Sequence, residues 1–253
     1  MKIKDNHQKK ITRSIGIMGS KPDSTLPDCD VIYFVNGSII MYGNQVNDDS
    51  RIVNVLNGNS IRNYERIKRY QDSGAPVGTL ISDMEKYKGT RFVVYNSEEN
   101  DSINILLDLG VPPENIRVIP RSERDAILKK LTGFRMPLGA FAAWCELSLY
   151  QFARLFYAGI LKRNVYYKKD FSPYLRPSTG IFAVLFAIDE HGFDSRYEIA
   201  GISFQRRDTY KVNNKVVRTD MVNKIDLQWH VIPDKKVVKR LLTHVELDLK
   251  IHE

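Results

Sequence analysis

The residues in this chain best suited to chemistry form a short turn, R-P-S-T-G, at 176–180. The turn combines a positive charge, a proline, two hydroxyls and a glycine, and eight apolar residues follow it directly at 181–188. A hydroxyl residue just before an apolar run is typical of a helix N-cap, so Ser178 is expected to begin a buried helix. A helix N-terminus also offers free N–H groups and a positive dipole end to an anion. The turn therefore predicts either a plain cap or an anion-binding site built by Ser178, Thr179 and Gly180.

Three predicted strands earlier in the chain each end in a small polar turn. The strands occupy 14–20, 31–38 and 51–59, and their turns are Gly19-Ser20, Asn36-Gly37 and Asn57-Gly58. A single Asn-Gly pair indicates little more than a turn. Parallel α/β sheets, however, bind ligands at the carboxyl ends of their strands. The recurrence after three successive strands therefore favours a nucleotide-binding edge.

Strand and helix patterns alternate along the chain. Further strands are predicted at 90–97, 115–120 and 196–204, and helices at 62–71, 102–110, 181–188 and 233–243. This alternation predicts an α/β fold with a Rossmann-like, mainly parallel sheet flanked by helices. Residues 1–13 are expected to form a polar N-terminal tail and 14–253 a single domain.

Two longer segments leave alternatives open. Residues 137–161 are apolar nearly all round, which predicts a buried helix; a membrane-surface helix is the alternative, because basic and aromatic residues follow at 162–171. Residues 205–229 are polar and form an insertion before the last predicted helix. Such an insertion is either a disordered loop or an active-site lid, and its Tyr210 and Trp229 favour a polar lid.

The composition fits a soluble globular protein with an anionic partner. The 253 residues are 43% hydrophobic and 27% charged, with a net charge of +8 at pH 7. The basic start at 1–10 has no apolar stretch behind it, so a signal peptide is not expected, and no run reaches the ~20 apolar residues that a membrane helix needs. We therefore expect a cytoplasmic protein, with peripheral contact at the inner face of the membrane as a further expectation. The lysines are spread out and no nucleic-acid-binding signature is present, so nucleic acid is not an expected partner.

The cysteines and acidic residues give little sign of metal or redox chemistry. Cys29 and Cys145 stand in apolar surroundings, which predicts buried thiols. The histidines and cysteines lack the spacing of zinc ligands, and Asp48-Asp49 does not form a convincing D-x-D element. No metal is therefore expected.

The order of the motifs resembles that of a known enzyme family. A strand with a glycine turn and two strands ending in asparagine come first, followed by R-P-S-T-G, a strand ending A-G-I-S-F, the polar segment and W-H-V-I-P-D-K-K. This order resembles the small bacterial sialyltransferases, whose corresponding turn is Arg-x-Thr/Ser-Ser-Gly. It is also similar to sialylmotif S of animal sialyltransferases. The resemblance covers roughly residues 14–243, and each motif in it is short.

The resemblance implies a metal-independent glycosyltransferase with one nucleotide-sugar-binding domain over 14–253. It would move sialic acid or a related ulosonic acid from a CMP-sugar, a co-substrate rather than a cofactor, to a bacterial surface glycan such as lipopolysaccharide or capsule. The acceptor is expected to be lipid-linked, and assembly into a homo-oligomer is a further expectation. The donor-binding positions carried over are Gly19, Ser20, Asn36, Asn57, Arg176, Ser178, Thr179, Gly180 and Tyr210.

His230 matches the family's essential histidine. An imidazole with a pKa near ~6.5 can take a proton from an acceptor hydroxyl at neutral pH. Direct attack at the anomeric carbon would then invert its configuration. Arg206 and Arg207 are expected to stabilise the phosphate of the leaving group, because a guanidinium matches phosphate geometry; a solvated basic loop is the alternative.

Two departures from the family pattern keep other functions open. Residues 19–23 are G-S-K-P-D where the family has Gly-Asn-Gly-Pro-Ser, and Gln205 stands where a tyrosine is expected. One alternative is a Kdo transferase using CMP-Kdo, related in fold and in some cases retaining configuration. The other is a non-catalytic module that binds nucleotide or glycan.

Overall fold

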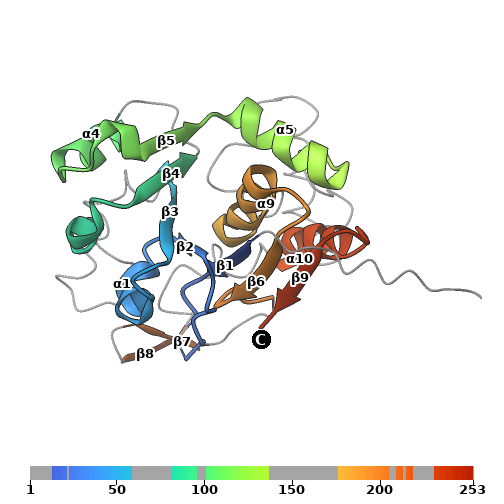
Figure 1. The fold of residues 1–253 in the computed structure, drawn as a ribbon, viewed down its shortest axis with the longest axis horizontal. Helices are drawn as coiled ribbons and strands as arrows, with labels where there is room; N and C mark the ends of the chain where they lie inside the picture. Colours follow the sequence, from blue (N-terminus) through green and yellow to red (C-terminus); the bar gives the residue numbers. More distant parts are fainter. Residues whose placement is uncertain are drawn as a thin grey trace, which may run out of the picture.

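A computed structural model shows the fold, and within it residues 13–21, 23–58, 81–95, 101–136, 176–204, 209–212, 215–218 and 231–252 are described. In these residues seven strands form one parallel sheet, in the order β5-β4-β3-β2-β1-β6-β9 (Figure 1). The strands are β1 (Ser14–Met18), β2 (Val31–Val35), β3 (Arg51–Asn57), β4 (Arg91–Tyr95), β5 (Ile116–Ile119), β6 (Arg196–Ala200) and β9 (Asp248–Ile251). The predicted α/β fold with a Rossmann-like parallel sheet is confirmed.

The central strands are short apolar runs buried on both faces, as parallel strands under two helical layers must be. All five residues of β2 are buried, and β1 is buried from Ile15 onward. Polar residues follow at the carboxyl ends, where the chain leaves the sheet at Gly19, Asn36 and Gly58. The three polar turns predicted from the sequence therefore lie along one edge.

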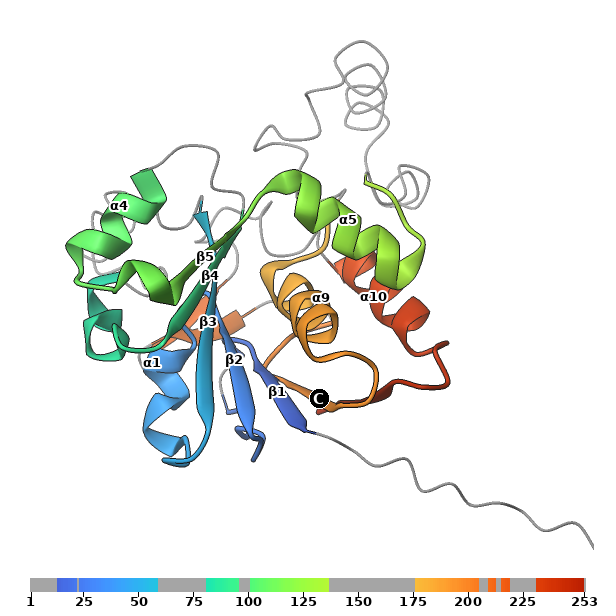
Figure 2. The ribbon, with the colours of Figure 1, turned by 45° about the horizontal axis from the view of Figure 1, so that its top comes forward.

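Helices cover both faces of the sheet (Figure 2). One face packs against α1 (Ile39–Tyr42), the 3-10 turn Ile81–Tyr87 and α4 (Asp101–Asp108), around Phe34, Phe92 and Leu106. The other packs against α5 (Arg121–Thr132), α9 (Thr179–His191) and α10 (Val231–Leu241), around Tyr33, Val55 and Tyr197. The two apolar clusters on either side of the sheet make a three-layer α/β domain.

The central helix is α9, which fills the space between the sheet and the outer helices. Every residue from Thr179 to Ile188 is buried. Its first charged residues come only at Asp189 and Glu190, where the helix reaches the amino end of the sheet. The apolar run predicted to cross the core does so.

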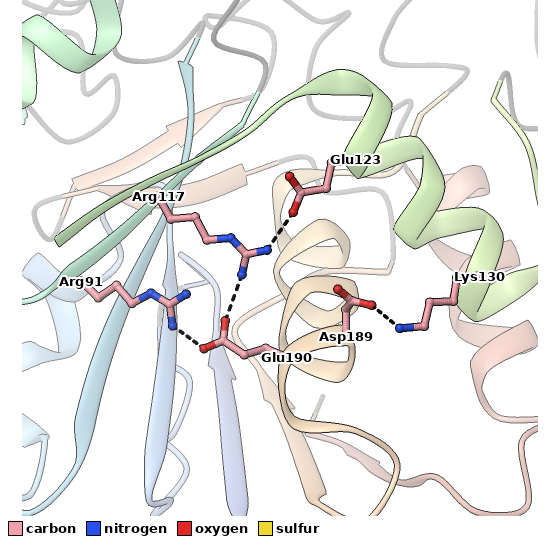
Figure 3. Close-up of polar contacts among 6 residues, drawn as sticks. All are labelled: Arg91, Arg117, Glu123, Lys130, Asp189 and Glu190. Atoms are coloured by element: carbon pink, nitrogen blue, oxygen red, sulfur yellow. Dashed lines mark hydrogen bonds and ion pairs between the residues drawn. The ribbon is translucent and has the colours of Figure 1, made fainter. Parts of the chain in front are cut away.

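Ion pairs tie this far end of α9 to its neighbours (Figure 3). Glu190 accepts from Arg91 at the start of β4 and also lies 3.5 Å from Nη1 of Arg117 on β5. The preceding residue, Asp189, lies 2.8 Å from Nζ of Lys130 on α5. Because these side chains are partly exposed, each pair contributes at most about 1 kcal/mol, and together they orient α9.

Several elements differ from the sequence-based expectation. Helix α5 was not predicted, and neither was β9, which pairs with β6 at the sheet edge. The strand expected over 196–204 ends at Ala200, because Gly201 turns the chain with φ +68°. The helix expected over 102–110 is α4, and Gly110, with φ +78°, terminates it as predicted.

Several sequence-based expectations lie outside the described residues. They concern the tail at 1–12, the helices at 62–71 and 137–161, Cys145, and most of the polar segment 205–229. Within that segment only β7 (Thr209–Val212) and β8 (Lys215–Arg218) are described, and they pair antiparallel. In the described part of the chain, no helix is long and apolar enough to cross a membrane.

Candidate functional site

The order of the strands singles out one position on the carboxyl edge of the sheet. From β1 the chain adds β2, β3, β4 and β5 on one side, then returns to place β6 on the other side of β1. The reversal between β1 and β6 is a topological switch point, and open α/β sheets bind ligands outside the carboxyl ends of the strands at such a point. The turn 176–180 and the three polar turns all lie on this edge.

The ends of β1 and β6 are held together by two glycines. The N–H of Gly19 donates to Ala200 O at 2.8 Å, and the N–H of Lys21 donates to Gly201 O at 2.9 Å. A Cβ on Gly19 would lie 2.2 Å from Gly201 O, which leaves no room for any side chain. The close approach that Gly19 permits is therefore to the neighbouring strand. Ser20, next in the chain, is exposed and faces solvent at the edge.

Asn36 and Asn57, which lie at the ends of adjacent strands, interact directly. Asn36 has φ +48°, a left-handed conformation that asparagine tolerates better than most residues. Its Oδ1 accepts from the N–H of Asn57 at 3.3 Å. Asn36 is exposed, whereas Asn57 is 7% exposed. Of the two, the side chain of Asn36 is thus the one that a ligand can reach without rearrangement.

The first turn of α9 is capped from within the protein. Oγ of Ser178 accepts from the N–H of Ile181 at 3.4 Å, which is the N-cap that the sequence predicts. The Tyr95 hydroxyl donates to Oγ1 of Thr179 at 2.7 Å. A Cβ on Gly180 would lie 2.7 Å from Cδ1 of Ile202, so a glycine at this position lets Ile202, which follows β6, pack against α9. The side chains of the turn therefore fix α9 in place.

These contacts join the separate motifs into one cluster. Tyr95 at the end of β4 is paired with Asn57 at the end of β3. Thr179 binds Tyr95, and Gly180 packs on Ile202 beyond β6. The α9 N-terminus is thus connected both to the asparagine pair and to the switch point.

Asp234 on α10 belongs to this cluster and is missing from the sequence-based prediction. Its Oδ1 accepts from the N–H of Ser178 at 2.7 Å, and the residue is 2% exposed. Burial raises the pKa of this carboxyl to about 7, although hydrogen bonds from Ser178 oppose the rise. The sequence gives no local signal for this contact, because Asp234 looks like any aspartate at a helix start and its partner Ser178 lies 56 residues earlier.

Two arginines, Arg124 and Arg176, lie close enough to the same turn to act on Tyr95. The Arg124 side chain on α5 is 1% exposed and is paired with Asp125 at 2.7 Å. Burial raises the pKa of the Tyr95 hydroxyl, and the charges of Arg176 and Arg124 oppose that rise. With the N–H groups of the first turn of α9, these arginines favour an anionic ligand at this edge.

The remaining predicted residues lie outside the described part of the chain. They are His230, Arg206, Arg207 and the side chain of Tyr210. His230 directly precedes Val231, the first residue of α10, and Asp234 fixes this end of α10 against Ser178. Among the described residues, no three His, Cys, Asp or Glu side chains are grouped to hold a metal ion. Cys29 is buried, as predicted, and burial raises the pKa of its thiol to about 11.

In comparisons with protein-family models, curated proteins and solved structures, nothing matches this chain.

Proposed function

We propose that the protein is a CMP-sugar-dependent glycosyltransferase that transfers sialic acid or a related ulosonic acid to a bacterial surface glycan. The observation that supports this most directly is the contact chain Asn57–Tyr95–Thr179. It connects the R-P-S-T-G turn to the polar ends of the central strands, so motifs more than 80 residues apart in the sequence share one edge. A CMP-sugar carries a phosphate and a carboxylate, which suit an N-terminal helix turn flanked by arginines.

In the proposed reaction the acceptor hydroxyl attacks the anomeric carbon of the donor. The bond from that carbon to the CMP phosphate breaks, CMP leaves with the bonding electron pair, and the hydroxyl proton passes to His230. The products are the glycoside and CMP, and a single displacement inverts the anomeric configuration. The first turn of α9 would hold the anionic donor, while Asp234 would keep that turn fixed beside the start of α10.

The donor site is tested first by thermal unfolding with CMP, compared with UMP, GMP and AMP. A ligand bound only by the native state stabilises it by about 2.7 kcal/mol at a hundredfold excess over Kd. We expect CMP to raise the melting temperature and the other three nucleotides to leave it unchanged. Equal shifts with all four, or none at millimolar CMP, would remove the basis for the transferase.

The reaction itself is tested with His230→Ala. Loss of the general base is expected to lower turnover of CMP-sialic acid or CMP-Kdo about a hundredfold or more, while the thermal shift with CMP is retained. A protein that binds CMP but turns over neither donor would be the non-catalytic module. Turnover with CMP-Kdo alone would identify the Kdo transferase. Unchanged turnover in the variant would rule out His230 as the base.

A further inference from the structure

The outer face of α10 is strongly basic. Lys235, Lys236, Lys239 and Arg240 are exposed, whereas Val237, Val238 and Leu241 are buried against the rest of the domain. Positions 235 and 239 are four residues apart and therefore lie one above the other on the helix. The spacing gives α10 one apolar face and one cationic face.

The end of α5 extends this cationic face. Nε of Arg240 donates to Thr132 O at 3.1 Å, and Nζ of Lys236 lies 4.9 Å from the ring centroid of Phe134. These contacts place α10 beside the exposed residues Lys129 and Arg135. Among the described residues, Lys129, Arg135, Lys235 and Lys239 form no ion pair. We name this surface, made by Lys129, Arg135, Lys235, Lys236, Lys239 and Arg240, the basic face.

Two exposed aliphatic side chains lie directly beyond α10. Leu242 is 54% exposed and Val245 is 101% exposed. The N–H of Leu242 donates to Val238 O at 2.9 Å, so Leu242 continues the helical register and follows Lys235 and Lys239 along the same face. These two aliphatic side chains give the end of α10 a surface that is both apolar and cationic.

We propose that the basic face and the Leu242–Val245 turn dock on an anionic lipid bilayer. Lysines and arginines are drawn to the negative surface of such a membrane, and exposed aliphatic side chains enter its headgroup boundary. The carboxylates between 231 and 247 are Asp234, which is buried, and Glu246, so the charge of this stretch is predominantly positive. A nucleic acid would match the charge but offers no apolar layer for Leu242 and Val245.

The surface begins next to the candidate site. Lys235 follows Asp234, whose carboxylate binds the first turn of α9. α10 runs from this carboxyl edge to the amino edge, where β9 begins, so docking would lay α10 along the membrane with its first turn beside the candidate site. The docking itself goes beyond the proposed transferase and does not depend on it.

Sedimentation of the full chain with vesicles tests the proposal. We expect binding to vesicles of phosphatidylcholine mixed with phosphatidylglycerol and little binding to phosphatidylcholine alone. The triple variant Lys129→Gln/Lys235→Gln/Lys239→Gln should bind about a hundredfold more weakly, because each lysine near an anionic surface contributes about fivefold. The matched control Arg51→Gln/Lys88→Gln/Lys250→Gln changes the net charge equally, uses residues exposed elsewhere, and should bind as the unaltered chain does.

A second variant separates the membrane from a nucleic acid. Leu242→Ser/Val245→Ser keeps every charge and should weaken vesicle binding roughly tenfold. A labelled RNA or DNA duplex measured in parallel should bind more weakly than the anionic vesicles. Equal vesicle binding by the two charge variants, no loss in the Leu242 and Val245 variant, or tighter binding to the duplex would each overturn the proposal. Both aliphatic side chains are exposed, so the fold should persist, and circular dichroism checks this.

Discussion

Replacing Asp234 with asparagine is expected to stabilise the protein above neutral pH and to flatten the pH dependence of its unfolding. The carboxyl has a pKa of about 7 in the folded chain and 3.8 as an unperturbed group, so the folded state binds the extra proton between these values. Stability contributed by this group is therefore present at low pH and is lost as pH rises towards 7. The loss between pH 5 and pH 8 amounts to about 3 kcal/mol.

The Asp234→Asn variant should not show this loss. Its amide oxygen can still accept from the N–H of Ser178, and it has no charge to bury. Unfolding by urea at pH 5 and pH 8 measures the difference; the variant should gain about 3 kcal/mol relative to the native chain on going to the higher pH. Parallel pH profiles for the two proteins would show that Asp234 is not the group that titrates. Asp189→Asn, which alters the partly exposed carboxylate at the other end of α9, serves as the control.

Gly201→Ala is expected to destabilise the domain by about 3 kcal/mol or more. Gly201 has φ +68°, and a Cβ there would lie 2.6 Å from Gly19 O. The left-handed conformation costs an alanine roughly 1–2 kcal/mol, and forcing two backbones apart adds roughly 1–3 kcal/mol. Because the displaced atom belongs to the backbone that follows β1, the change should also weaken CMP binding at the switch point.

Two other glycines distinguish the cost of a left-handed φ from the cost of a steric clash. Gly133 has φ +73° and a Cβ there would have nothing within 4 Å, so Gly133→Ala should cost only the conformational part, roughly 1–2 kcal/mol. Gly89 has open space and no left-handed φ, so Gly89→Ala should change stability by less than about 0.5 kcal/mol. The order Gly201, Gly133, Gly89 in urea-unfolding free energy is the expected result. If Gly201→Ala lowered the free energy of unfolding no more than Gly133→Ala, the close contact between Gly19 and Gly201 would not be a source of stability.

Local patterns were enough for the central strands and for the start of α9. The runs that became β1, β2 and β3 are short, apolar and followed by turn residues, and parallel strands buried on both faces require just this. Ser178 before an apolar run specified the N-cap, because a cap depends on residues three apart. The position of the asparagine pair followed from the same logic, since adjacent parallel strands end on the same edge.

The elements that were missed have weak local signals. In β9 the sequence D-L-K-I alternates between exposed and half-buried residues, and only pairing with β6 makes it a strand. Helix α5 is mostly polar. Its few buried apolar residues, Ile127, Leu128 and Leu131, pack in the core shared with α9 and α10. An edge strand and an outer helix bury only part of their surface, so their sequences carry less of the apolar pattern.

By itself the sequence determined the class of fold, the apolar strands, the cap of α9 and the set of polar turns at the strand ends. Only the tertiary structure decided the strand order, the contact of Gly19 with Gly201, the burial of Asp234 against Ser178 and the joining of α5 to α10 in one basic face. The physical reason is distance along the chain. Caps, turns and periodicity depend on residues a few positions apart, whereas these contacts join residues whose proximity exists only after the sheet has assembled.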